Sequence, residues 1–158
     1  MPCRLKLCAA TSRTCGWTPS LTRPTPPCGR AAEFAAPYLR LRARELQQAC
    51  DAIGHVETGR AVITPGFRLR AKFIIHTAGP VWRGGGQGEE EQLKSCYRNS
   101  LRLARENGCE SVAFPLISSG IYGYPKAQAL RAASEAIWAY LDTEDVDEEM
   151  TVYLCVFE

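Results

Sequence analysis

The stretch from residue 111 to residue 141 places the tightest constraint on the fold. Residues 111–117 form an almost continuous apolar run, which is typical of a strand buried on both faces. The loop 118–124 follows, and Pro125 stands where a helix can begin with proline. The helix is predicted to extend to about Leu141. A buried strand that leads through a short loop into a helix is the repeating unit of α/β folds.

The rest of the chain from residue 43 onward continues this alternation. Apolar spacing predicts helices over 43–53, 89–107 and 125–141, and strands over 61–64, 72–77, 111–117 and 151–157. We therefore expect an α/β protein with helices layered on a mixed, mainly parallel sheet. The 158 residues have room for one domain and one core, so a single domain over 1–158 is predicted.

Composition excludes some classes of protein. No apolar run approaches the ~20 residues that a membrane span needs, and the chain start lacks the apolar core of a signal peptide. We expect a cytoplasmic location and reduced thiols. A formal net charge of +2 points to no particular partner. We expect neither membrane association nor an oligomer.

The 8 cysteines do not form a recognisable metal or disulfide pattern. None lies in a CxxC pair, and the 2 histidines, His55 and His76, add little, so neither a zinc site nor another metal site is expected. Cys50, Cys96 and Cys155 lie among apolar positions and are predicted to be small core residues. No histidine is placed in the sequence to activate a cysteine, so a catalytic cysteine is not expected.

Residues 9–42 fit no helix or strand pattern. Residues 1–44 carry eight Lys or Arg side chains against one acid, Glu33, and six of the 10 prolines. A basic arm that binds nucleic acid is one interpretation. However, the arginines are spread singly and no aromatic residues alternate with them for base stacking, so nucleic-acid binding is not expected.

Loop 118–124 carries the chemistry that the sequence suggests most directly. A glycine-containing turn between a buried strand and a helix points several backbone N–H groups in one direction, and these groups can bind an anion. An ordinary strand-to-helix turn, whose glycines serve backbone geometry alone, explains the same spacing equally well. The loop matches neither a P-loop nor the nucleophile elbow of serine hydrolases.

Three segments together resemble the macrodomain family: 59–67, 73–82 and 114–125. The resemblance covers about 43–158, with a candidate first strand within residues 1–8. It implies a three-layer α/β/α fold. It also implies binding of ADP-ribose, related nucleotide metabolites or ADP-ribosylated proteins, and no cofactor. It implies a structural role for His76 and places Phe157 on the adenine side. It further implies that one loop binds the diphosphate and the distal ribose, through Ser118, Ser119, Gly120, Ile121, Tyr122 and Gly123. Tyr122 is implied to lie near the distal ribose.

The early site motifs of macrodomains are absent from the printed sequence. In macrodomains these motifs have sequences like GDIT, DAVVNAAN and GGGVDGAI. In this chain they would fall in residues 9–42, the segment that fits no helix or strand pattern. When each codon is read from its last base onward, residues 9–38 permit all three motifs in order. Trp17 has one codon and Thr18 begins with AC, which forces an aspartate at the first position of the second motif. We therefore interpret residues 9–41 as translated out of frame, with a compensating shift just before Ala43.

The shifted frame also bears on catalysis. Hydrolytic macrodomains often carry an aspartate in the third motif, and here the codons of Phe34 and Ala35 permit cysteine or arginine alone at that position. The resemblance leaves three alternatives open: an enzyme that hydrolyses ADP-ribosyl or O-acetyl-ADP-ribose esters, a non-catalytic ADP-ribose reader, and a non-functional frameshifted product. No catalytic residue is assigned. We further expect the fold to lack the C-terminal helix that macrodomains commonly add after the last strand.

Overall fold

The computed structural model describes residues 5–9, 44–67, 71–143 and 150–156. The segment interpreted as out of frame, apart from Ala9, lies outside the described residues, as does Phe157. The elements are β1 (Leu5–Ala9), α2 (Arg44–Ile53), β2 (Ala61–Pro65), β3 (Phe73–Thr77), α3 (Glu89–Glu106), β4 (Ser111–Pro115), α4 (Lys126–Thr143) and β5 (Thr151–Val156). Helices alternate with strands, as the sequence predicts.

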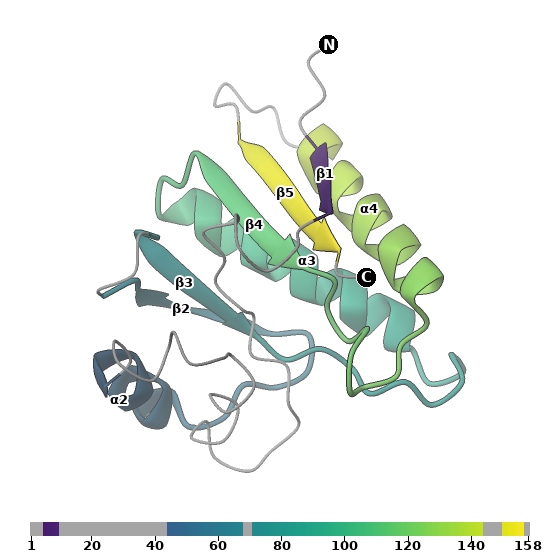
Figure 1. Ribbon diagram of the computed structural model, residues 1–158, viewed down its shortest axis with the longest axis horizontal. Helices are drawn as coiled ribbons and strands as arrows, with labels where there is room; N and C mark the ends of the chain where they lie inside the picture. The colour runs from purple at the N-terminus through teal and green to yellow at the C-terminus, as the bar shows by residue number, and fades with distance from the viewer. Residues whose placement is uncertain (1–4, 10–43, 68–70, 144–149, 157–158) are drawn as a thin grey trace.

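The strands form two sheets of different character. Strands β1, β5 and β4 pair in that order, and both pairs are parallel. Strands β2 and β3 form a separate antiparallel pair, because residues 66–72 between them are too few for the crossover that a parallel pair needs. Figure 1 shows β3, β4 and β5 running in the same direction, so the loops that follow β3 and β4 lie at the same end of the molecule.

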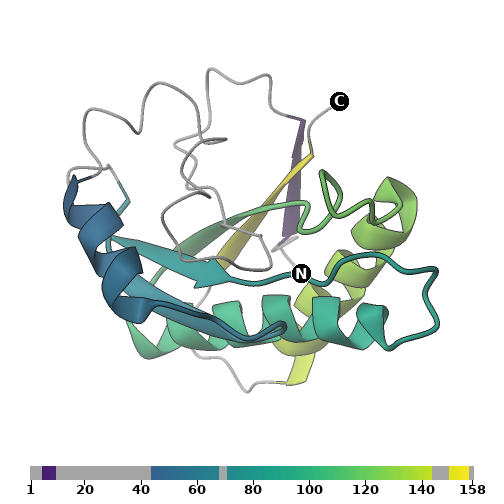
Figure 2. The same cartoon turned by 90° about the horizontal axis from the view of Figure 1, so that it is seen from below.

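The helices lie on both sides of the β2–β3 pair. Helices α3 and α4 lie together on one side of the strands, as Figure 2 shows. Alternate side chains of β3 point in opposite directions. Ile75 packs against the core that α3 and α4 build, whereas His76 faces Cys50 of α2. Helix, sheet and helix therefore form the three layers of an α/β/α arrangement at this point.

The core fills the space between α3, α4 and the parallel strands. Its completely buried members include Leu93 and Leu101 of α3, Ile137 of α4 and Leu154 of β5. The prediction for Cys50, Cys96 and Cys155 is confirmed, because all three are buried in the core. Burial of this apolar surface is the main force that holds α3 and α4 against the sheet.

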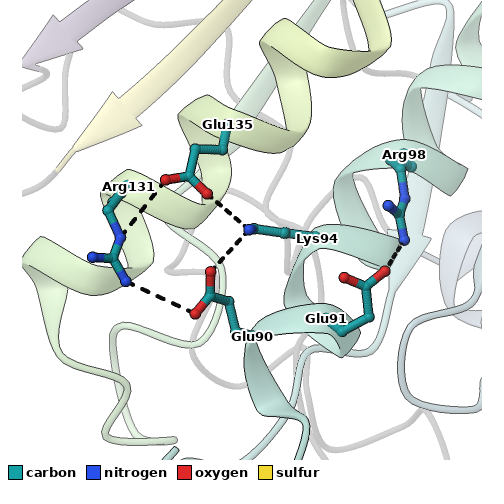
Figure 3. A network of polar contacts seen from close by, with 6 residues as sticks. All are labelled: Glu90, Glu91, Lys94, Arg98, Arg131 and Glu135. Carbon is teal, nitrogen blue, oxygen red and sulfur yellow. Dashed lines mark hydrogen bonds and ion pairs between the residues drawn. The ribbon is translucent and has the colours of Figure 1, made fainter.

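Four charged side chains join α3 to α4 on the surface (Figure 3). Lys94 Nζ lies 2.8 Å from Glu90 Oε1 and 2.7 Å from Glu135 Oε2. Arg131 makes longer contacts of 3.8 Å with each of these two carboxylates. The two carboxylates raise the pKa of Lys94, chiefly through the hydrogen bond that Lys94 donates to Glu135, so this ammonium stays charged.

Candidate functional site

Loop 118–123 lies between the carboxyl end of β4 and the first turn of α4 (Figure 1). In open α/β sheets, ligands bind outside the carboxyl ends of the strands, and the amino end of a helix favours negative charge. The loop turns sharply, since Gly123 N–H donates to Gly120 O at 3.0 Å and Tyr124 N–H donates to Ser118 O at 3.1 Å. These bonds fix its path toward the helix.

The outer part of the loop presents backbone donors. Gly120 is exposed, and Ile121 keeps 65% of its surface exposed although it is a large apolar residue. Within the described part of the chain, neither backbone N–H has a hydrogen-bond acceptor. A Cβ added to Gly120 would meet nothing within 4 Å. The loop therefore offers two open N–H donors with room for an anion in front of them.

The inner part of the loop is buried and tightly packed. Ser118 has a left-handed φ of 64° and is 3% exposed, and its hydroxyl has no hydrogen-bond partner among the described residues. Ser119 is anchored differently, because its hydroxyl donates to Leu116 O at 2.8 Å. Tyr122 is 5% exposed, so its ring lies mostly inside the protein. The six site residues of the sequence analysis thus separate into a buried base and an exposed rim.

A second loop, which sequence reasoning did not assign to the site, contacts the first. It follows β3, and its Trp82 N–H donates to Tyr122 O at 2.9 Å. The Trp82 and Tyr124 rings lie 4.5 Å apart between centroids. A glycine-rich run after a strand was visible in the sequence, but no sequence signal linked it to residues 40 positions later.

Glu89 fixes the shape of this second loop. The side chain stands at the start of α3, and Glu89 is 2% exposed. Its carboxylate accepts backbone N–H donors from Gln87 at 2.7 Å, Arg83 at 3.1 Å and Gly85 at 3.3 Å. The hydrogen bond from its own backbone, with those from the loop, lowers the pKa of Glu89, so the carboxylate stays ionised.

His76 lies apart from the loop, in a buried polar cluster. Its Nε2 lies 2.9 Å from Thr64 Oγ1, and its Nδ1 lies 4.0 Å from Cys50 Sγ. Burial lowers the pKa of His76 to about 4, so the ring is neutral at pH 7. No histidine is placed in the sequence to activate a cysteine, but the fold brings His76 of β3 beside Cys50 of α2, a contact that sequence reasoning did not find. Both residues are buried, which agrees with a structural role.

Two kinds of feature are missing from the residues that the structure describes. None of their helices is long and apolar enough to cross a membrane. They hold no group of three His, Cys, Asp or Glu side chains that could bind a metal ion.

The family profile and the similar proteins point to the same family. The sequence profile described as "Macro domain" matches residues 38–133. A macro domain-containing protein of Chlorobaculum tepidum is 51% identical over 113 residues, which are 72% of this chain and 64% of that protein. An O-acetyl-ADP-ribose deacetylase of Cronobacter sakazakii is 44% identical over 130 residues, which are 82% of this chain and 70% of that protein.

The solved structures agree with the sequence relatives. An Oceanobacillus iheyensis macrodomain with ADP is 32% identical to this chain, with a TM-score of 0.63, and the match covers 98% of this chain and 76% of that one. The α/β fold is therefore that of the macrodomains. The chain spans 59–66% of the length of several curated relatives that it matches.

Proposed function

Because the chain belongs to the macro domain family, we propose that it binds ADP-ribose or ADP-ribosyl groups through the backbone of loop 118–123. The observation that carries the proposal is the pair of open N–H donors at Gly120 and Ile121, beside the amino end of α4. A diphosphate supplies the acceptors that these donors lack. The related macrodomain with ADP supports a ligand that contains a diphosphate.

In this proposal the residues of loop 118–123 contact different groups of the ligand. The N–H groups of Gly120 and Ile121 bind the diphosphate, and the absence of a side chain at Gly120 leaves room for it. The exposed Ile121 side chain covers the bound ligand from outside. Tyr122, beneath the rim, lies nearest the distal ribose, and Ser118 and Ser119 form the floor.

Ester hydrolysis is the second candidate function. The deacetylase relative supports it. Loop 118–124, however, carries no carboxylate and no imidazole, so it offers no general base. His76 is engaged with Thr64 and is buried, so it does not supply one. The described residues thus support binding more directly than catalysis, and a non-catalytic reader of ADP-ribosylated proteins fits them.

Calorimetric titration of the chain as printed tests binding. We expect ADP-ribose and ADP to bind and AMP, which has one phosphate, to bind at least tenfold more weakly. Gly120→Asp places a carboxylate before the open donors and should weaken ADP-ribose binding at least tenfold by charge repulsion. Gly108→Asp is the control, since Gly108 is exposed at the far end of α3 and a Cβ there meets nothing within 4 Å. Its φ of 62° is left-handed, and aspartate is among the residues that best tolerate that conformation. Equal affinities for the two variants would refute the proposed site.

Acetate release from O-acetyl-ADP-ribose separates the enzyme from the reader. Binding without acetate release favours the reader, and multiple turnovers establish the hydrolase. Cooperative thermal unfolding with a higher midpoint in ADP-ribose would refute the non-functional alternative, because a ligand stabilises a chain only when it binds the folded state.

A further inference from the structure

The loop after β3 has a hydrogen-bonding arrangement that the proposed function does not explain. We call residues 82–88 the tryptophan loop. One buried carboxylate, that of Glu89, accepts N–H donors from three of its residues. An exposed glycine-rich loop has high conformational freedom, and ordering it is costly. Three hydrogen bonds to one carboxylate hold this loop in a single conformation, which indicates that its conformation has a role in the protein.

The tryptophan loop closes around the indole of Trp82. Gly85 lies against the ring, so that a Cβ on Gly85 would come within 2.8 Å of Trp82 Cη2. The same Gly85 donates its N–H to Glu89. The position of the indole is therefore set by a backbone segment that Glu89 holds in place.

Trp82 in turn contacts loop 118–123 and the residue after it. Its backbone N–H donates to Tyr122 O, and its ring packs on the Tyr124 ring. These two contacts lie on either side of Gly123, which has a left-handed φ of 69°. A shift of the indole would therefore rotate the backbone that carries the open donors of Gly120 and Ile121.

We propose that Glu89 and Trp82 are positioning residues, which set the conformation of loop 118–123 so that its N–H donors are arranged before the ligand arrives. The proposal rests on the proposed function for its ligand, and neither residue is assigned a contact with it. Preorganisation raises affinity because less ordering remains to be done on binding. An unanchored loop 118–123 would have to order itself around the diphosphate.

Two adjacent glycines provide a matched test. Gly84 and Gly85 both have left-handed φ values, of 103° and 84°. Alanine is strained at each, but a Cβ on Gly84 meets nothing within 4 Å, whereas a Cβ on Gly85 meets the Trp82 ring. Gly85→Ala displaces the indole, and Gly84→Ala imposes the backbone strain without that displacement.

Two measurements on these variants decide the proposal. In the ligand-free protein, Gly85→Ala should shift the amide resonances of residues 120–123, and Gly84→Ala should leave them in place. Calorimetry should show ADP-ribose binding at least tenfold weaker for Gly85→Ala than for Gly84→Ala, at a temperature where circular dichroism shows both variants folded. A merely structural role predicts a lower thermal midpoint for Gly85→Ala than for Gly84→Ala, but equal affinities of the two folded variants.

The conservative pair Glu89→Gln and Glu91→Gln supplies a second comparison. Both stand in the first turn of α3 and both lose one charge, but Glu91 is exposed and pairs with Arg98. Glu89→Gln should move the amides of residues 120–123, and Glu91→Gln should not. Unmoved amides in Gly85→Ala and Glu89→Gln overturn the positioning proposal. A wild-type chain that fails to bind ADP-ribose overturns the proposed function instead, because the ligand-free spectra still report on the loops.

Discussion

Gly79 and Ser118 approach so closely that a Cβ on Gly79 would lie 2.3 Å from Ser118 Oγ. The same Cβ would lie 2.5 Å from Ile117 Cγ2. Gly79 follows β3 and Ser118 follows β4, so the backbone after one strand meets side chains at the end of the other, beside the candidate site. A residue with any side chain at position 79 would require the buried Ser118 and Ile117 side chains to shift.

Gly79→Ala should therefore destabilise the protein by about 1–3 kcal/mol, the usual cost of inserting an atom into a packed interior. Urea unfolding at fixed pH measures the change. Gly120→Ala serves as the control, because its Cβ meets nothing within 4 Å and its effect should stay within about 0.5 kcal/mol. Adding Ser118→Gly to Gly79→Ala should recover part of the loss, and a strictly additive double variant would argue against the contact.

Tyr97→Phe tests how the base of the loop is anchored. The buried Tyr97 hydroxyl donates to Pro115 O at 3.2 Å and accepts the Ile117 N–H at 3.1 Å. Burial raises the pKa of this phenol, so it remains a neutral donor. Phenylalanine leaves the buried Ile117 N–H without its acceptor, which costs about 1–3 kcal/mol. Faster hydrogen exchange at the Ile117 amide should accompany the loss, and an unchanged exchange rate would contradict this assignment.

The alternation of helices and strands could be predicted from the sequence because each element is encoded by a local apolar period. The boundaries differ by two residues or fewer. Strand β4 ends at Pro115 rather than at residue 117, since the turn in which Ser119 bonds to Leu116 O begins there. Helix α4 continues to Thr143, two residues beyond the prediction.

The candidate site was predictable only where it is contiguous. Loop 118–123 is one segment, so its glycines and its place before a helix were visible. The contact of Trp82 with Tyr124 and the contact of Cys50 with His76 join distant segments. Such contacts depend on which face of which strand each helix covers, and apolar periodicity does not encode that choice.

Lys94→Met should weaken the link between α3 and α4. Lys94 makes two short contacts with carboxylates on both helices, and its side chain keeps 21% of its surface exposed. We expect a loss of up to about 1 kcal/mol at low salt and a smaller loss at high salt, because ions screen exposed pairs. Arg131→Met, whose contacts are 3.8 Å long, should cost less. Thermal unfolding at two salt concentrations measures both, and an equal loss from the two variants would contradict the ranking.

The stability of the fold should fall in mild acid because of His76. Burial lowers the pKa of His76 to about 4 from the ordinary 6.5. Above pH 6.5 the imidazole is neutral in both states, and its contribution to stability is fully present. Between pH 6.5 and about 4 only the unfolded chain binds the proton, so the free energy of unfolding falls as the pH falls. The total loss is about 3 kcal/mol, and below pH 4 this contribution changes no further.

Urea unfolding of wild type, His76→Gln and His55→Gln between pH 7 and pH 4 tests this dependence. The difference between wild type and His76→Gln should shrink steadily as the pH falls, because glutamine cannot titrate. His55 is exposed, and His55→Gln should follow the wild-type curve throughout. Carboxylates that titrate in the same range act on all three proteins equally, so they cancel in the difference. A difference that stays constant across this range would show that His76 is not held neutral by burial.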